Sequence, residues 1–201
     1  TLFNRSALVS TNNLCKLKTG EFKANIDYSF NRVTASASNI TTYFLDEGNR
    51  VITENRDGTE HTHSLGGKFI YELNKKTAFI NNTLQTDIDW NDISLRTGGS
   101  LPNMQTVSQP DYYVGNRFKM IKRFNGKHLV TFESRNEWES LPQTLDIDIN
   151  DNPYSQHIGD HAFFTHESAA YTFSIKGITA SLEGGLKGYL RSMNSELPDI
   201  P

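Results

Sequence analysis

The strongest constraint on the fold is a stretch in which apolar and polar residues alternate, turn back and alternate again. It runs from Tyr112 to Trp138 and reads YYVGNRFKMIKRFNGKHLVTFESRNEW. Strict alternation places successive side chains on opposite faces of an extended chain, and Asn-Gly between two such runs is a turn signal. The stretch therefore predicts an antiparallel β-hairpin that turns near Asn125-Gly126.

The two runs also predict how the strands of this hairpin pair. A two-residue loop at Asn125-Gly126 would set Phe118 opposite Glu133, an apolar residue against a charged one. A three-residue loop, Phe124-Asn125-Gly126, avoids this clash, because a shift of one residue exchanges the two faces of a strand. It requires Gly126 in the left-handed conformation. The pairs it predicts are Phe118 with Phe132, Met120 with Val130, Tyr112 with Trp138 and Arg117 with Glu133.

The same alternation recurs along the chain, and no stretch combines a helical period with helix caps. Tight turns are expected near Gly20, Lys75, Gly126 and Gly177. Between them lie three polar connections that exceed the usual hairpin loop, at 46–60, 91–111 and 139–160. We therefore predict one all-β domain over residues 1–201, an antiparallel up-and-down meander of about eight long strands that forms a barrel or a barrel-like curled sheet. The expected strands cover 8–17, 22–45, 65–73, 78–90, 112–123, 127–138, 163–175 and 178–191.

The length of these strands and their aromatic residues indicate a membrane barrel. Globular strands average about 5 or 6 residues, whereas a tilted strand needs about 9 to 11 to cross a bilayer. Aromatic side chains gather near both ends of the strands, as in interfacial girdles, although strands favour aromatic residues in any setting. The residues toward the long connections are Trp90, Tyr112, Tyr113, Trp138, Phe163 and Phe164, and those toward the tight turns are Phe22, Tyr71 and Phe124. The polar faces, which carry Asn25, Asp27, Arg117, Lys119 and Glu133, would then line a lumen.

The sequence contains no phosphate-binding loop, zinc motif or hydrolase motif, so neither an enzyme nor a cofactor is expected. A formal charge of −3 gives no electrostatic case for nucleic acid. Asp146, Asp148 and Asn150 are spaced like the opening of a calcium loop, but the later positions do not match one. His61 and His63 share one side of a strand, yet their spacing requires no metal. No metal site is therefore predicted.

One candidate ligand site remains, made of aromatic residues. Trp90, Tyr112, Tyr113 and Trp138 are expected to lie close together at the rim formed by the long connections. Such rings could stack on a sugar or another nutrient. The same rings also suit a membrane girdle, so the sequence leaves both roles open.

Three short phrases set in the long strands carry a family resemblance. They are Thr42-Tyr43-Phe44-Leu45, Met120-Ile121-Lys122-Arg123 and Ser140-Leu141-Pro142-Gln143. With the alternating turns, they resemble TonB-dependent outer-membrane receptors of Gram-negative gut bacteria, and more narrowly the middle of the barrel in members thought to bind nutrients. In that family the barrel encloses an N-terminal plug, and import is driven through contact with TonB. No residue here matches the plug or the TonB-contact segment.

The resemblance implies a non-catalytic role in the cell outer membrane, where the chain would help to bind and import a nutrient. The expected partners are the nutrient, the rest of the receptor chain and outer-membrane lipid, because so few strands would be a fragment of a larger barrel. A partial barrel leaves two open edges, so alone it could close on itself, pair in a dimer or fold into a sandwich. The alternative is a soluble all-β ligand-binding module of lipocalin-like type, with its faces reversed. Alternation is the same in both, so it does not say which face is inward.

Overall fold

The computed structural model describes residues 2–45, 48–99, 102–125, 127–149 and 152–196, to which every structural statement below refers. These residues form a single antiparallel sheet and contain no helix, hence none that could cross a membrane. The all-β meander predicted from the alternation is thus confirmed. Its strands are β1 (Leu2–Leu17), β2 (Gly20–Leu45), β3 (Gly48–Lys75), β4 (Ala78–Gly99), β5 (Asn103–Phe124), β6 (His128–Ser140), β7 (Gln143–Ile149), β8 (Asn152–Ile175) and β9 (Ile178–Glu196).

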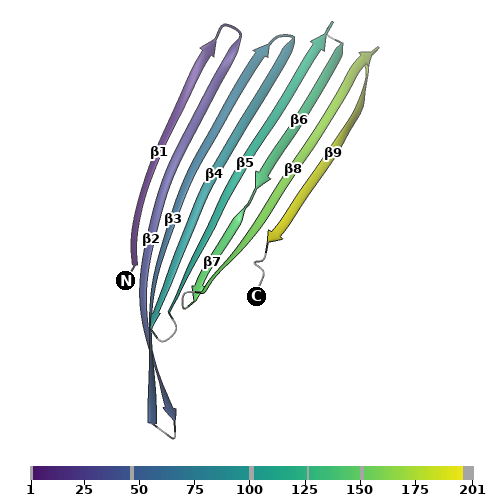
Figure 1. The fold of residues 1–201 in the computed structure, drawn as a ribbon. Helices are drawn as coiled ribbons and strands as arrows, with labels where there is room; N and C mark the ends of the chain where they lie inside the picture. Colours follow the sequence, from purple (N-terminus) through teal and green to yellow (C-terminus); the bar gives the residue numbers. More distant parts are fainter. Residues whose placement is uncertain (1, 46–47, 100–101, 126, 150–151, 197–201) are drawn as a thin grey trace.

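Strands that follow one another in sequence are neighbours across most of the sheet, as Figure 1 shows. The short strand β7 explains why nine strands form where about eight were predicted. The strand β5 is longer than β6, and β7 pairs with β5 beyond the end of β6. Pro142 lies between β6 and β7 and has no N–H for the ladder, so β6 ends there and β7 forms separately within the connection expected at 139–160.

The sheet is open among the described residues. The strand β1 pairs with β2 alone, and β9 pairs with β8 alone, so each has an outer edge with no strand beside it. Of the two predicted forms, the structure shows the curved sheet and not the closed barrel (Figure 1).

The tight turns lie where the sequence places them. Leu17 pairs with Gly20, and Ile175 pairs with Ile178, which leaves two residues in each turn. In the last turn Lys176 and Gly177 both have positive φ, 48° and 82°. Two positive φ values in a two-residue loop match the twist of the flanking strands, which suits a long hairpin.

The central hairpin keeps its predicted faces, but the predicted pairing is wrong by two residues. Phe124 pairs with His128, so the loop covers 125–127 instead of 124–126. Asn125 has a positive φ of 47°, a conformation that Asn tolerates better than most residues. Gly126, for which the left-handed conformation was predicted, lies outside the described residues. The observed pairs are Phe118 with Ser134, Met120 with Phe132, Tyr112 with Ser140 and Arg117 with Arg135.

A displacement of two residues leaves every side chain on the same face, so alternation could not detect it. The observed register instead pairs Lys119 with Glu133, whose Nζ and Oε1 lie 2.5 Å apart. The rings of Phe118 and Phe132 remain diagonal neighbours, with centroids 6.0 Å apart. The apolar contact that motivated the prediction therefore survives without direct pairing.

The three long polar connections are not loops, which corrects the prediction of long loops at one end. Strands β2 and β3 pair out to Leu45 and Gly48, and β4 and β5 pair out to Thr97 and Asn103. The third connection contains β7 and the first part of β8. Ladder hydrogen bonds join backbone groups and do not require apolar side chains, so polar segments can extend a hairpin as well as end it.

The sheet is one layer thick and has no buried hydrophobic residue among the described ones. The accessible surface is 14355 Å² for a chain of 22.7 kDa. A compact monomer of that mass would expose about 9,500 Å². Both faces of the sheet are therefore available to their surroundings, and any functional site must lie on one of them.

Candidate functional site

The two faces of the sheet differ in chemistry, and the register shows which residues share each face. The apolar face carries Phe22, Phe69, Ile88, Phe132 and Phe163. The polar face carries Asn25, Asp87, Arg117, Glu133 and Lys187. Continuous pairing keeps this division from β2 onward, as the sequence predicted for the central hairpin and for β2, whereas β1 carries both kinds of residue on each face.

This division holds only between the tight turns and a row of aromatic residues on the apolar face. The aromatic row consists of Trp90, Tyr112, Trp138 and Phe163. We call the part between the tight turns and this row the turn-side region; it covers 6–17, 20–30, 63–75, 78–90, 112–124, 128–138, 163–175 and 178–190. The remaining parts of the strands form the extension, which is the lower part of Figure 1.

In the extension the polarity of the faces is reversed on β4 and β7. The face that is apolar in the turn-side region carries Asp92, Ser94 and Arg96 on β4, and Asp146 and Asp148 on β7. The opposite face carries paired apolar residues, because Val107 lies between Ile93 and Leu145. The apolar members of this inner patch are Ile93, Leu95, Val107, Leu145, Ile147 and Tyr154. Each face of the sheet thus has an apolar part and a polar part.

Ion pairs cross the polar face in the turn-side region. The guanidinium of Arg135 donates two hydrogen bonds of 2.7 Å to the carboxylate of Glu137, and Arg117 donates a third of 3.2 Å. Tyr113 also hydrogen-bonds to Glu137. The Glu137 side chain is 16% exposed, against 63% for Arg117 and 45% for Arg135. The carboxylate is therefore held at the centre of a group of three donors.

Carboxylates gather on the polar face beside this group, near the border with the extension. Asp89 lies opposite Asp111, a direct pairing of like charges that disfavours the sheet. Burial raises the pKa of Asp111, and the nearby carboxylates of Glu139, Asp89 and Asp87 raise it further. This part of the face would attract cations, although no group of three or more His, Cys, Asp or Glu residues in the described ranges could hold a metal ion.

Asp160 differs from Asp89 and Asp111 because an arginine forms an ion pair with it. The guanidinium of Arg191 donates two hydrogen bonds to it, of 3.0 and 2.5 Å. These bonds hold the pKa of Asp160 below its usual value. The pair joins β8 to the edge strand β9 at the start of the extension.

The four aromatic residues of the candidate ligand site do not share a face. Trp90, Tyr112 and Trp138 lie on the apolar face, in the aromatic row. Tyr113 lies on the polar face, where it contacts Glu137 and covers the position that a Cβ on Gly115 would occupy. Adjacent residues in a strand point to opposite faces, so the sequence could have separated Tyr113 from Tyr112.

Of the histidines and acidic residues that the sequence offered as metal ligands, His63 and Asp146 contact neighbouring side chains instead. His63 forms a hydrogen bond of 2.8 Å with the hydroxyl of Tyr28, and its ring packs against Phe30. Asp146 and Asp148 point to the same face of β7, and Ser155 donates a hydrogen bond to Asp146. Asn150 lies outside the described residues.

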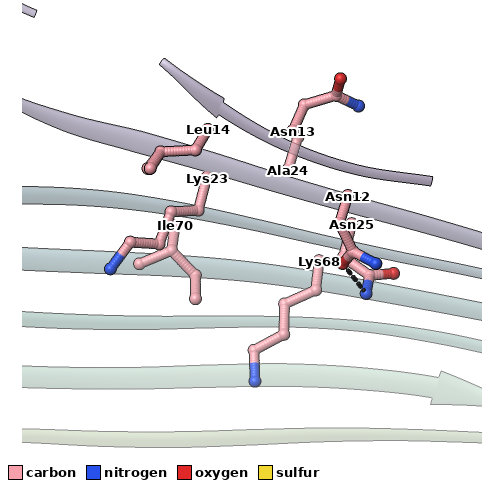
Figure 2. A pocket seen from close by; sticks show the side chains of 8 residues that line it. All are labelled: Asn12, Asn13, Leu14, Lys23, Ala24, Asn25, Lys68 and Ile70. Atoms are coloured by element: carbon pink, nitrogen blue, oxygen red, sulfur yellow. Dashed lines mark hydrogen bonds between the residues drawn. The ribbon is translucent and has the colours of Figure 1, made fainter. Parts of the chain in front are cut away.

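A hollow on the polar face lies over β1, β2 and β3 (Figure 2). Lys23 and Lys68 extend from neighbouring strands beside Ile70. The Nδ2 atom of Asn25 donates a hydrogen bond of 2.6 Å to Oδ1 of Asn12 at the other end of the hollow. Oδ1 of Asn25 is buried there without a hydrogen-bond partner among the described residues. None of the lining side chains is itself fully buried, so the chemistry of the hollow is that of a solvated strand surface with two cations.

Comparisons with known proteins give little information. No protein-family model matches the chain, and no curated protein matches it in sequence. Among solved structures it resembles the ferric yersiniabactin uptake receptor FyuA from Yersinia pestis, with a TM-score of 0.24 and 9% sequence identity. The match covers 96% of this chain and 39% of that one. A likeness this weak carries no argument, so function must be argued from the sheet itself.

Proposed function

We propose that this chain is a segment of the wall of an outer-membrane β-barrel, of the TonB-dependent receptor type, that binds and imports a nutrient without catalysis. The supporting observation is the apolar face of the turn-side region. It is exposed in a one-layer sheet, and it ends at a row of aromatic residues. An apolar face of limited height, bordered by aromatic rings, matches the lipid-facing surface of a transmembrane barrel.

The polar face supports the same proposal. Its ion pairs would face a water-filled lumen, where charged groups keep part of their hydration. The carboxylates near Asp111 and the ring of Tyr113 would lie along the path of a nutrient. Trp90, Tyr112 and Trp138 would instead lie at the level of the lipid headgroups, so of the four candidate ligand residues we propose a ligand contact for Tyr113.

In our proposal, the reversal of polarity marks the level at which the membrane ends. Beyond the aromatic row, Asp92, Ser94 and Arg96 would face water outside the membrane. A soluble lipocalin-like barrel would have to cover the apolar face of the turn-side region and would have no reason to reverse it at the aromatic row. In our proposal the two open edges of the sheet pair with further strands of the same receptor.

Accessibility to lipid tests the proposal. In a Cys15→Ser background, Ile26→Cys on the apolar face and Asn25→Cys on the polar face of β2 would each carry a fluorophore in reconstituted vesicles. Lipids with a quencher on the acyl chain should quench the label at Ile26 and leave that at Asn25 largely unquenched. Equal quenching at the two sites, or a protein that remains folded and monodisperse without lipid or detergent, would exclude the membrane proposal in favour of the soluble module.

A further inference from the structure

A group of polar side chains on neighbouring strands interrupts the apolar face of the turn-side region. They come from four neighbouring strands, β4, β5, β6 and β8, and each is half-buried by the side chains around it. Apolar neighbours surround them, since Phe118 pairs with both Asn82 and Ser134. We call this group the polar patch; its members are Asn82, Asn116, Ser134, Asn136, Thr165 and Glu167.

Hydrogen bonds connect most of the patch. The carboxylate of Glu167 accepts hydrogen bonds from Ser134 Oγ at 2.8 Å and from Asn136 Nδ2 at 3.1 Å, both at Oε1. Asn136 Oδ1 in turn accepts a hydrogen bond of 2.8 Å from Thr165 Oγ1. At the other end, Asn116 Nδ2 donates to Asn82 Oδ1 over 3.1 Å. The patch therefore consists of two hydrogen-bonded groups, one of four residues on β6 and β8 and one of two residues on β4 and β5.

The two ends of the patch have unused hydrogen-bonding capacity of opposite kinds. Among the bonds formed by the described residues, none reaches Oε2 of Glu167, which can only accept while ionised. The Nδ2 group of Asn82, with two N–H donors, likewise has no bond there. Glu167 on β8 thus offers an acceptor, and Asn82 on β4 offers two donors.

The position of these two ends suggests what covers them. Asn82 and Glu167 lie in one row across the strands, with Phe118 and Ser134 between them. When two copies pack face to face about a two-fold axis that runs along the strands, each presents the same patch to the other, and the left side of one faces the right side of the other. Such pairing brings the donor end on β4 of each copy toward the acceptor end on β8 of its partner. Lipid tails offer neither donors nor acceptors.

We propose that the polar patch is the centre of a homodimer interface, in which the apolar face of one copy packs on that of a second copy. The carboxamide of Asn82 in each copy donates to the carboxylate of Glu167 in the other, and the surrounding apolar side chains exclude lipid and water from these bonds. This inference rests on the proposed function, because it assumes that the apolar face lies in a membrane. It adds a protein partner to a surface otherwise assigned to lipid.

Site-specific crosslinking of the full natural chain in lipid nanodiscs tests this interface. In the Cys15→Ser background, Phe118→Cys places a thiol at the centre of the patch and leaves its hydrogen bonds intact. Ile26→Cys provides the matched control on the same face, on β2 and far from the patch. An oxidant should link Phe118→Cys into covalent dimers and leave Ile26→Cys monomeric. Ser134→Cys provides a second thiol in case Phe118→Cys folds poorly.

Replacing both ends of the patch should weaken the dimer. Asn82→Leu combined with Glu167→Leu removes the proposed bonds and should raise the dimer dissociation constant about tenfold, as expected for losing two symmetry-related hydrogen bonds in a membrane. A wild-type protein that is monomeric in nanodiscs, equal crosslinking at residues 26 and 118, an unchanged dissociation constant, or crosslinks only to lipid or to another protein would overturn the proposal. Acyl-chain quenching of a label at Ile26 in the same samples separates the two claims. Quenching there without a dimer refutes the interface alone, whereas no quenching there refutes the membrane setting.

Discussion

The turn-side region and the extension use the same backbone in opposite ways. Both consist of the same continuous strands, and β4 runs through both without a break in pairing. In the turn-side region its apolar residues, such as Leu84 and Ile88, point to one face; in the extension Ile93 and Leu95 point to the other. The backbone pairing is therefore the same in the two regions, and only the side chains differ. This change of side chains fits our proposal that the surroundings of the sheet change at the aromatic row.

The largest expected effect comes from a charge on the apolar face. Ile26→Arg should lower the free energy of unfolding in a bilayer by about 2–4 kcal/mol, the cost of a cationic side chain facing lipid at mid-depth. Thr34→Arg lies on the same face of the same strand but in the extension, and should change it by less than about 0.5 kcal/mol. Denaturant titration in vesicles measures both. Similar values for the two variants would remove the distinction between the regions.

The inner patch of the extension should give a smaller effect. Val107→Asn disrupts two cross-strand apolar pairs, with Ile93 and Leu145, which contribute about 0.2–1 kcal/mol each. Hydrogen exchange of the β4, β5 and β7 amides in the extension should become faster, with little change at the tight turns. Thr106→Asn, on the opposite face, is the control and should leave exchange unchanged; equally fast exchange in it would argue against an apolar inner patch.

Loss of the central carboxylate on the polar face should have a modest effect. Glu137→Gln removes the charge that Arg117 and Arg135 share. Because both guanidinium groups are largely exposed, unfolding should become easier by no more than about 1 kcal/mol. The difference should shrink in high salt, in denaturant titrations at two ionic strengths. A loss that is large and independent of salt would mean that this face is not in contact with water.

The smallest effect concerns pH. The folded pKa of Asp160 is lowered by Arg191, so their pairing stabilises the extension above the ordinary carboxyl pKa, and the contribution is lost as pH falls through the folded value. Arg191→Gln should raise the Asp160 pKa toward its ordinary value in an NMR titration of the side-chain carboxyl. Lys187→Gln, a nearby change on the same face, should leave the pKa of Asp160 unchanged. An unaltered titration in Arg191→Gln would show that the pair does not form.

Much of the fold could be predicted because it depends on the two-residue period and on turn chemistry. Alternation gave the strands and their faces, and the turn residues located the reversals near Gly20, Lys75 and Gly177. Pairing could not be fixed to better than two residues, since a slip of two preserves the faces. The extension was mistaken for loops because its polar residues lack the expected pattern, although its backbone continues the ladder.

The sites were harder to predict because they depend on which strands become neighbours. Asn116, Ser134 and Asn136 could be seen in the sequence as polar residues on an apolar face. The hydrogen bonds of Ser134 and Asn136 to Glu167 could not, because they require β6 to pair with β8, from which β7 separates it in the sequence. The carboxylate pairing of Asp89 with Asp111 likewise depends on the register of β4 and β5.

In our proposal, the apolar face meets lipid only as far as the aromatic row. Single spin labels at successive positions 86–97 of β4 in vesicles, read with oxygen and with a water-soluble nickel complex, test it most directly. We predict oxygen maxima at Ile88 and Trp90, followed by nickel maxima at Asp92, Ser94 and Arg96 with Ile93 and Leu95 shielded. Oxygen maxima that continue at even positions through Arg96, or nickel maxima at even positions throughout, would contradict the account.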